Sequence, residues 1–257
     1  MNKRFSKVFV GTNHKMVKTN QQTLDYLRAL QKLTADIPRS QFELFVLPPY
    51  ISLADACRQV DQSLITIGAQ NMHWEEQGQF TGEISPVMLK DVGVRLVMVG
   101  HAERRQIFGE TDEMVNHRVL ASLRHGFQTL ICIGETADDK RYGTSRERLA
   151  EQIKIGLYGV TQEAWKQIWV AYEPVWAIGE HGEEADPLYV NHMHAHIRET
   201  LTHSKGYNRE IPVLYGGSVN LANASELINQ PEVDGLFIGR AAWDADNFNK
   251  ILRTIFS

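Results

Sequence analysis

Residues 96–133, with the sequence LVMVGHAERRQIFGETDEMVNHRVLASLRHGFQTLICI, contain one complete copy of a pattern that repeats along the chain. Two short apolar runs, Leu96–Val99 and Thr129–Ile133, are typical of strands buried on both faces of a parallel sheet. Between them, Thr111–His125 has a helical pattern, and Gly126 follows where a helix would end. A strand, a helix and a second strand in this order predict a β–α–β unit.

The same alternation continues in both directions from this unit. Eight apolar runs separated by helical segments over about 250 residues predict an α/β protein, a (β/α)8 barrel forming a single domain over residues 1–257. A doubly wound open sheet is the alternative, but no G-x-G-x-x-G motif follows any expected strand. The six further strands are expected at Lys7–Val10, Glu43–Leu47, Leu64–Ile67, Ile168–Tyr172, Val213–Tyr215 and Leu236–Ile238, with helices at Ser85–Gly93, Glu147–Gly156, Leu188–Leu201 and Asn247–Phe256.

The composition excludes several classes of protein. The 27 Lys and Arg residues nearly balance 31 Asp and Glu, and the net charge of −4 argues against a binder of nucleic acid or anionic membranes. Two cysteines, Cys57 and Cys132, are too few for a disulfide scaffold and lack the spacing of a metal site. No apolar run reaches the roughly 20 residues that cross a bilayer, and the first residues lack a signal-peptide stretch. We therefore expect a cytoplasmic protein with reduced cysteines.

Polar residues follow several of the expected strands, at the end where the active sites of parallel barrels lie. Asn13 and Lys15 follow the first strand, His101 and Glu103 the fourth, and Glu173 the sixth. Each of these alone has an ordinary structural explanation, such as a surface charge or a loop ion pair. Their shared position on one face favours a common site, to which two glycine-containing turns also belong: Gly216–Ser218 and Gly239–Arg240.

These residue types suit one kind of chemistry. Glycine turns that lead into helices offer backbone N–H groups to a phosphate. A carboxylate can remove a proton from carbon if an electrophile stabilises the resulting enediolate. A neutral histidine can donate to that oxygen, and a lysine can neutralise the developing charge. The set predicts an aldose–ketose isomerase of a small phosphorylated sugar that requires neither a metal nor an organic cofactor.

The sequence resembles the triosephosphate isomerase family, whose motifs occur in the family's order from Val10 to Phe248. This resemblance implies a barrel enzyme that acts on a small sugar phosphate such as dihydroxyacetone phosphate. The matching segments are GTNHKM (11–16), GAQN (68–71), FTGEIS (80–85), GHAERRQIFGETDE (100–113), CIGE (132–135), AYEPVWAIG (171–179), YGGSVN (215–220) and DGLFIG (234–239).

The resemblance also implies roles for the residues after the strands. Glu173 matches the catalytic base, and His101 matches the electrophile, which is kept neutral by a helix N-terminus. Lys15 matches the electrostatic residue, Asn13 helps to orient the substrate oxygens, and Glu103 is implied to support Lys15.

Further matches concern the phosphate, the lid and the subunit interface. Pro174–Gly179 matches the start of a lid that excludes water. The loop Asn71–Glu83, with Thr81 at its tip, matches an element that family dimers insert beside the partner's active site, so a homodimer is implied with Thr81 and Glu83 in this loop. The residues implied to hold phosphate are Gly179, Gly217, Ser218, Gly239 and Arg240.

Some positions depart from the family's usual residues. His14 replaces a tryptophan, and Ala102 replaces a serine whose hydroxyl holds the base when it is swung out. The second half of the lid, residues 180–187, is acidic and about one residue longer than usual. Arg240 replaces the second glycine of the phosphate turn, where its guanidinium would contact the phosphate or pair with a lid acid such as Glu183 or Asp186.

These departures leave three interpretations open. The first is a triosephosphate isomerase that has drifted at a few positions. The second is an isomerase of a four-carbon ketose phosphate, L-erythrulose 1-phosphate and D-erythrulose 4-phosphate, because family members of that type in tetritol catabolism look similar at the Gly-Arg turn. The third is a non-catalytic sugar-phosphate-binding dimer, although every proton-transfer residue is present.

Overall fold

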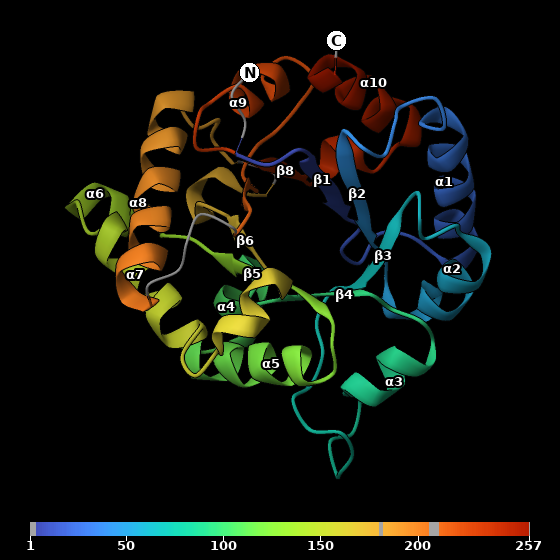
Figure 1. The fold of residues 1–257 in the computed structure, drawn as a ribbon, viewed down its shortest axis with the longest axis horizontal. Helices are drawn as coiled ribbons and strands as arrows, with labels where there is room; N and C mark the ends of the chain where they lie inside the picture. Colours follow the sequence, from blue (N-terminus) through green and yellow to red (C-terminus); the bar gives the residue numbers. More distant parts are fainter. Residues whose placement is uncertain (1–3, 180–181, 206–210, 257) are drawn as a thin grey trace.

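The computed structural model describes residues 4–179, 182–205 and 211–256, which form a closed barrel with a ring of helices around it (Figure 1). Eight parallel strands follow one another around the barrel in chain order, and the last pairs with the first. This confirms the (β/α)8 prediction over the open sheet. The strands are β1 (Val8–Asn13), β2 (Phe42–Leu47), β3 (Thr66–Ala69), β4 (Leu96–Val99), β5 (Gln128–Ile133), β6 (Ile168–Tyr172), β7 (Val213–Tyr215) and β8 (Gly235–Ile238).

Helices cover the outside of the barrel, with short 3₁₀ turns at several strand ends. The α-helices are α1 (Asn20–Leu33), α2 (Leu53–Gln59), α3 (Pro86–Asp91), α4 (Ala102–Phe108), α5 (Asp112–Arg124), α6 (Ala137–Tyr142), α7 (Ser145–Gly156), α8 (Pro187–Lys205), α9 (Ala224–Ile228) and α10 (Ala245–Phe256). The 3₁₀ turns are η1 (Tyr50–Ser52), η2 (Gln162–Gln167), η3 (Val175–Ala177) and η4 (Arg240–Ala242).

The expected helix signals are confirmed where they were strongest. The Ser85 side chain accepts a hydrogen bond from the N–H of Met88, and Pro86 occupies the first turn of α3. The Thr111 side chain caps α5 in the same way, and Gly126, with φ of 73°, follows that helix. These residues satisfy backbone groups that the helix itself leaves unpaired, which is why they mark helix ends in the sequence.

Two strands differ from the prediction by more than one residue at a boundary. Strand β3 begins two residues later than expected, because Leu64 and Ile65 donate their amides to the carbonyl of Asp61 in a turn. Strand β1 extends to Asn13, which pairs in register with Leu47 of β2. Asn13 is therefore the last residue of a strand rather than part of a loop, and its backbone position is set by the sheet.

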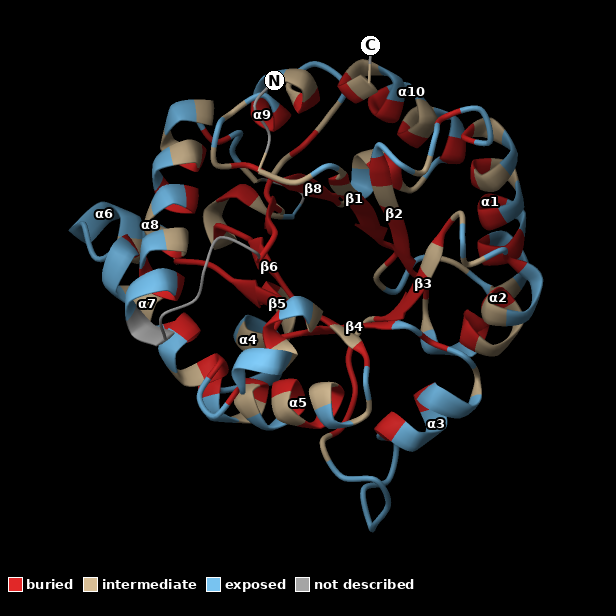
Figure 2. Ribbon diagram, in the orientation of Figure 1, coloured by how far each residue is buried: buried red, intermediate tan, exposed pale blue. Residues whose placement is uncertain are grey.

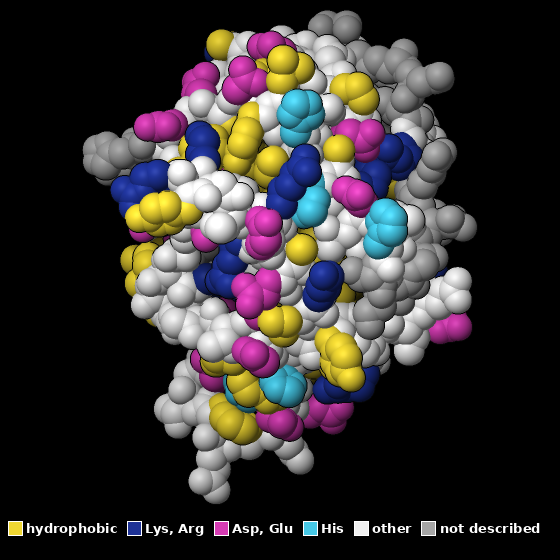
Figure 3. Space-filling view, turned by 90° about the vertical axis from the view of Figure 1, so that its left-hand side faces the viewer, with side chains coloured by type: hydrophobic (Ala, Val, Ile, Leu, Met, Phe, Trp, Pro, Cys, Tyr) yellow, Lys and Arg dark blue, Asp and Glu magenta, His cyan; other side chains and the backbone are white. Residues whose placement is uncertain are grey.

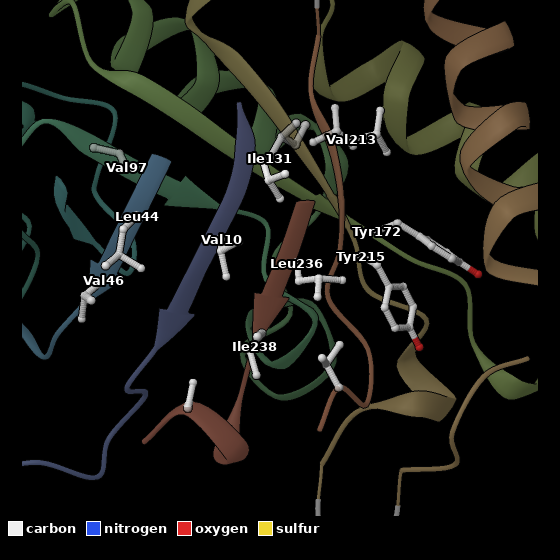
Figure 4. Close-up of a cluster of buried hydrophobic side chains, with 14 of the residues drawn as sticks. Val10, Leu44, Val46, Val97, Ile131, Tyr172, Val213, Tyr215, Leu236 and Ile238 are labelled. Carbon is white, nitrogen blue, oxygen red and sulfur yellow. The ribbon is translucent and has the colours of Figure 1, made fainter. Parts of the chain in front are cut away.

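Successive side chains of each strand point to opposite faces of the sheet and belong to two separate cores. The barrel interior holds Phe45, Leu47, Leu96, Met98, Leu130, Cys132, Trp169, Ala171, Leu214 and Phe237. The other strand residues pack against the helices, and Figure 4 shows part of this outer core, including Val10, Leu44, Val97, Ile131 and Leu236. The strands are buried on both sides, and the exposed residues lie mainly on helices and loops (Figure 2). Burial on both faces explains why the strands read as continuous apolar runs.

The face that carries α7 and α8 shows no dominance of one charge (Figure 3). Figure 3 views the side that carries α7 and α8, where Lys and Arg side chains alternate with Asp and Glu and with several histidines. This mixture agrees with the net charge of −4. Among the helices that the structure describes, none is both long enough and apolar enough to span a membrane.

Candidate active site

A cavity of about 730 Å³ opens at the carboxyl ends of the strands. Its walls come from the ends of β1, β4, β6, β7 and β8 and from the first part of the lid, so segments that are far apart in the sequence meet in it. All ten residues predicted for catalysis and phosphate binding line this cavity: Asn13, Lys15, His101, Glu103, Glu173, Gly179, Gly217, Ser218, Gly239 and Arg240.

His101 is the N-cap residue of α4, and its ring is buried. Its Nδ1 accepts a hydrogen bond of 3.2 Å from the backbone N–H of Glu103. A ring nitrogen that accepts carries no proton, so this geometry describes a neutral imidazole with its proton on Nε2. Nε2 lies 3.4 Å from Oε1 of Glu173 and faces the reacting part of the cavity.

Glu173 directly follows β6 and is only 2% exposed. Its backbone N–H donates to the carbonyl of Ile133 at 2.7 Å, and a Cβ at Gly134 would overlap the Glu173 carbonyl, so glycine permits this close approach. Its Oε2 accepts from the backbone N–H of Ala102 at 3.2 Å. The serine hydroxyl that the family uses here is absent, as the sequence indicates, but the main chain of Ala102 supplies a donor to the carboxylate.

Cys132 lies beneath the site, in the barrel interior. Burial and the neighbouring Glu173 carboxylate raise the pKa of its thiol well above the usual range. The thiol therefore stays protonated at neutral pH and behaves as a small apolar side chain rather than as a nucleophile.

Lys15 is held in place from several directions. It is the one non-glycine residue with positive φ, 51°, in the part of the chain that the structure describes. Its backbone N–H donates to Oδ1 of Asn13 at 2.8 Å, and its carbonyl accepts from Nε2 of Gln70 at 2.9 Å. Its ammonium lies 2.6 Å from Oε1 of Glu103, the acid that the resemblance places beside it. The sequence reasoning gave Gln70 no role, although it lies in the GAQN motif.

The residues predicted to bind phosphate come from three loops and line the same cavity. Gly179 has φ of 93°, a conformation that favours glycine, and a Cβ at Gly217 would overlap the hydroxyl of Tyr215. Gly239 and Ser218 complete the cradle at the ends of β8 and β7. Glycine-containing turns of this kind can offer backbone N–H groups to an anion.

The Arg240 side chain contacts a backbone carbonyl of the lid. Its Nη2 donates to the carbonyl of Gly179 at 3.1 Å. Asp186, one of the two acids proposed as its partner, instead accepts from the N–H groups of Leu188 and Tyr189 at the start of α8. Residues 180 and 181 of the acidic lid segment lie outside the described residues.

The start of the lid is also fastened through Trp176. The buried carboxylate of Glu135 accepts three hydrogen bonds at its Oε1: from the indole of Trp176 at 2.9 Å and from the hydroxyls of Tyr172 and Tyr189, both at 3.0 Å. The ammonium of Lys140 lies 3.3 Å from the centre of a Trp176 ring. The sequence reasoning assigned no role to Glu135, although it closes the CIGE motif.

His14 lies between two site residues but points away from the cavity. Its ring is buried edge-on against Tyr26, with 4.4 Å between ring centres. Neither ring nitrogen has a hydrogen-bond partner among the described residues. Burial, with a smaller contribution from Lys18, lowers the pKa of His14 to about 3, so the ring is uncharged at neutral pH.

Thr81 and Glu83 do not line the cavity of their own chain. They belong to the segment between β3 and α3, which projects beyond the ring of helices (Figure 1). Thr81 at the tip is exposed. A role of this loop in the site would therefore require another molecule.

Comparisons with known proteins agree with this geometry. The family model for triosephosphate isomerase matches residues 8–255. The L-erythrulose-1-phosphate isomerase of Rhizobium etli is 46% identical over 250 residues, which cover 96% of this chain and 92% of that protein. The triosephosphate isomerase of Acetivibrio thermocellus is 41% identical over 249 residues, 96% of this chain and 98% of that protein. The crystal structure of triosephosphate isomerase from Bartonella henselae, 32% identical, superposes with a TM-score of 0.87 over 97% of this chain and 99% of that one. The chain belongs to the triosephosphate isomerase family and is an isomerase.

Proposed function

We propose that this isomerase interconverts L-erythrulose 1-phosphate and D-erythrulose 4-phosphate. The observation that carries the proposal is Arg240 in the phosphate turn, where its guanidinium reaches the lid carbonyl of Gly179. The similar proteins from Rhizobium etli, at 46% identity, and Mesorhizobium japonicum, at 44%, are both named L-erythrulose-1-phosphate isomerases. These relatives support the four-carbon interpretation of the Gly-Arg turn.

The two candidate substrates share most of their structure. In both L-erythrulose 1-phosphate and dihydroxyacetone phosphate, the phosphate-bearing carbon is attached to the carbonyl carbon. The four-carbon compound differs by one hydroxymethyl group on the carbon that loses its proton, at the end away from the phosphate. The same cradle and the same proton-transfer residues therefore serve either substrate, and discrimination depends on how the lid and the cavity walls accommodate that extra group.

The residues perform a balanced proton shift. Glu173 leaves the Ala102 N–H and removes the proton from the hydroxyl-bearing carbon beside the carbonyl. His101 donates from Nε2 to the substrate oxygens as an enediolate forms, and Lys15 offsets the negative charge. Glu173 then returns a proton to the former carbonyl carbon while an O–H proton leaves the other oxygen. The carbonyl has moved by one carbon, and no atom or electron is gained or lost.

Isomerisation of dihydroxyacetone phosphate and glyceraldehyde 3-phosphate is the second candidate. The complete set of Asn13, Lys15, His101 and Glu173 in one cavity favours it as much as the first. The relative from Acetivibrio thermocellus, at 41% identity, is named a triosephosphate isomerase.

A side-by-side assay distinguishes these candidates. We expect kcat/KM for L-erythrulose 1-phosphate to exceed that for dihydroxyacetone phosphate by at least tenfold, measured by NMR in D2O with both erythrulose phosphates as starting material. Glu173→Gln is the matched control, and it should lower kcat for both substrates by orders of magnitude without unfolding the protein.

Two other results of this assay would each support one of the other two functions. Faster turnover of dihydroxyacetone phosphate would overturn the four-carbon proposal in favour of the second candidate. If a phosphorylated enediolate mimic binds but no deuterium enters either substrate, the protein is a non-catalytic sugar-phosphate-binding dimer.

We also propose that the protein works as a homodimer in a reducing compartment such as the cytoplasm. The projecting loop with Thr81 and Glu83 supports the dimer, because its tip is exposed and is available to a second copy. The free cysteines Cys57 and Cys132 suit a reducing compartment.

A further inference from the structure

Trp243 lines the active-site cavity, yet no catalytic or phosphate-binding role described above involves it. It caps the η4 turn, directly after the phosphate-binding Gly239–Arg240 segment. Its indole Nε1–H donates to the backbone carbonyl of Asn13 at 2.8 Å. The side chain thus joins the end of β8 to the end of β1, 230 positions away in the sequence.

The Asn13 carbonyl lies where the sheet can no longer supply a partner. The pairing of β1 with β8 ends at Thr12 and Ile238, because the chain after Gly239 turns into η4. The indole N–H supplies the donor that the next residue of a longer β8 would have given. Leaving a partly buried backbone carbonyl without a partner is costly, so this contact fixes the carbonyl in place.

Asn13 in turn fixes Lys15. Its Oδ1 accepts the Lys15 backbone N–H, which helps to hold Lys15 at a φ of 51°. A non-glycine residue keeps such a conformation only where its surroundings maintain it. A shift of the Asn13 backbone would therefore move the Lys15 ammonium, which is one of the charged groups of the site.

The η4 turn is itself firmly held, so the indole projects from a rigid support. The Ala242 carbonyl accepts from the buried hydroxyl of Tyr26 at 2.6 Å, and the Ala241 carbonyl accepts from Nδ2 of Asn247 at the same distance. The same turn carries the phosphate-binding residues Gly239 and Arg240.

We propose that Trp243 is a positioning residue that sets the separation between the phosphate turn and the Asn13–Lys15 segment. This deepens the proposed function and rests on it, because that separation must match the distance from the phosphate to the enediolate oxygens. When the substrate phosphate is held on the turn, the enediolate oxygens then lie at the right distance from Lys15.

Two ligands test this inference without turnover. Inorganic phosphate probes the turn alone, whereas 2-phosphoglycolate, a phosphorylated carboxylate, spans the turn and the enediolate position. In Trp243→Phe, which keeps an aromatic ring but loses the N–H, we expect Kd for 2-phosphoglycolate to rise at least tenfold and Kd for inorganic phosphate to stay within twofold, by calorimetry. Trp169→Phe is the control. It removes an indole near the start of β6, whereas the active-site cavity lies at the carboxyl end of that strand, and it should leave both Kd values within twofold.

Kinetics give the second measurement. For whichever ketose phosphate the wild type isomerises, Trp243→Phe should lower kcat by at least tenfold, and Trp243→His, which keeps a ring N–H donor, should lose less. Equal loss in the two variants, an unchanged 2-phosphoglycolate affinity, or a parallel loss of inorganic phosphate affinity would each overturn the inference. Absence of isomerisation by the wild type would overturn the proposed function instead, and the two binding constants would still decide the role of Trp243.

Discussion

In the proposed mechanism, Glu173 must break one hydrogen bond before it can act as the base. In the structure its carboxylate lies 3.2 Å from the Ala102 N–H and 3.4 Å from Nε2 of His101, almost fully buried. A buried carboxylate requires such donors, since desolvation of the charge is otherwise costly. Binding of substrate has to replace the Ala102 N–H contact, which is worth about 1.5–3 kcal/mol for a charged acceptor. In the proposed mechanism, this main-chain donor would hold the base at rest.

Arg240 links the phosphate turn to the lid, and its removal should alter substrate preference. Because the guanidinium holds the Gly179 carbonyl, Arg240→Gly releases the first part of the lid as well as a wall of the cavity. We expect a rise in KM for both ketose phosphates and a change of at least threefold in the ratio of their kcat/KM values. The measurement is steady-state kinetics on L-erythrulose 1-phosphate and dihydroxyacetone phosphate. An unchanged ratio would mean that Arg240 acts only on the phosphate end, which the two substrates share.

His14 should make the protein sensitive to acid. Its pKa is about 3 in the folded chain and 6.5 without burial, so between these values the unfolded chain binds the extra proton and stability falls as the pH falls. His14→Phe removes this group and should reduce the dependence of the unfolding free energy on pH by up to about 1.4 kcal/mol per pH unit in that window. Urea melts between pH 7 and pH 4 measure it.

Two other histidines provide the controls for this experiment. His194, whose pKa burial also lowers to about 3, should retain its own share of the slope in the His14→Phe variant. The exposed His203 should contribute no comparable change when it is replaced by Phe. If the free energy of unfolding changed equally with pH in the wild type and in His14→Phe, this would contradict the burial of an uncharged His14.

At the scale of elements, the strands and their carboxyl ends could be predicted because local pattern determines both. Strand β4, for example, is a run of four apolar residues in the sequence and four buried residues in the barrel. In a parallel barrel the residue after each strand faces the same cavity, so strand positions alone brought His101 and Glu173 together. The error at β3 arose because Leu64 is apolar but belongs to a turn, and hydrophobicity does not distinguish these cases.

Local pattern does not predict contacts between elements, because these depend on where distant segments meet across the barrel. Gln70 reaches Lys15, and Trp243 reaches Asn13, without any local signal that names the partner. The partner of Arg240 is a backbone carbonyl. Because every residue has a carbonyl, the residue types do not single this one out, and the charges in the sequence favoured the lid acids instead. The donor from Ala102 was missed for the same reason, since a backbone N–H leaves no trace in the residue type.

At the scale of the whole molecule, several large apolar side chains are exposed, including one directly after Lys15 and one in the projecting loop. Met16, directly after Lys15, is 96% exposed, and exposed apolar residues also occur at Ile51, Phe80 and Met88. Exposed apolar side chains of this kind are common at protein interfaces. Because Met16 adjoins Lys15, a partner that covers it would also fix the segment that carries the ammonium.

This arrangement predicts that assembly and activity are lost together. The wild type should have a mass in solution of twice its 29.3 kDa chain, by light scattering. Thr81→Arg places a charge at the loop tip, where burial against a partner would be costly, and should give a monomer with at least a hundredfold lower kcat. Tyr142→Arg, which changes an equally exposed residue on α6, should remain dimeric and active. A wild type that is monomeric and fully active would show that the site is complete within one chain, and the exposed apolar side chains around Lys15 would then need another partner.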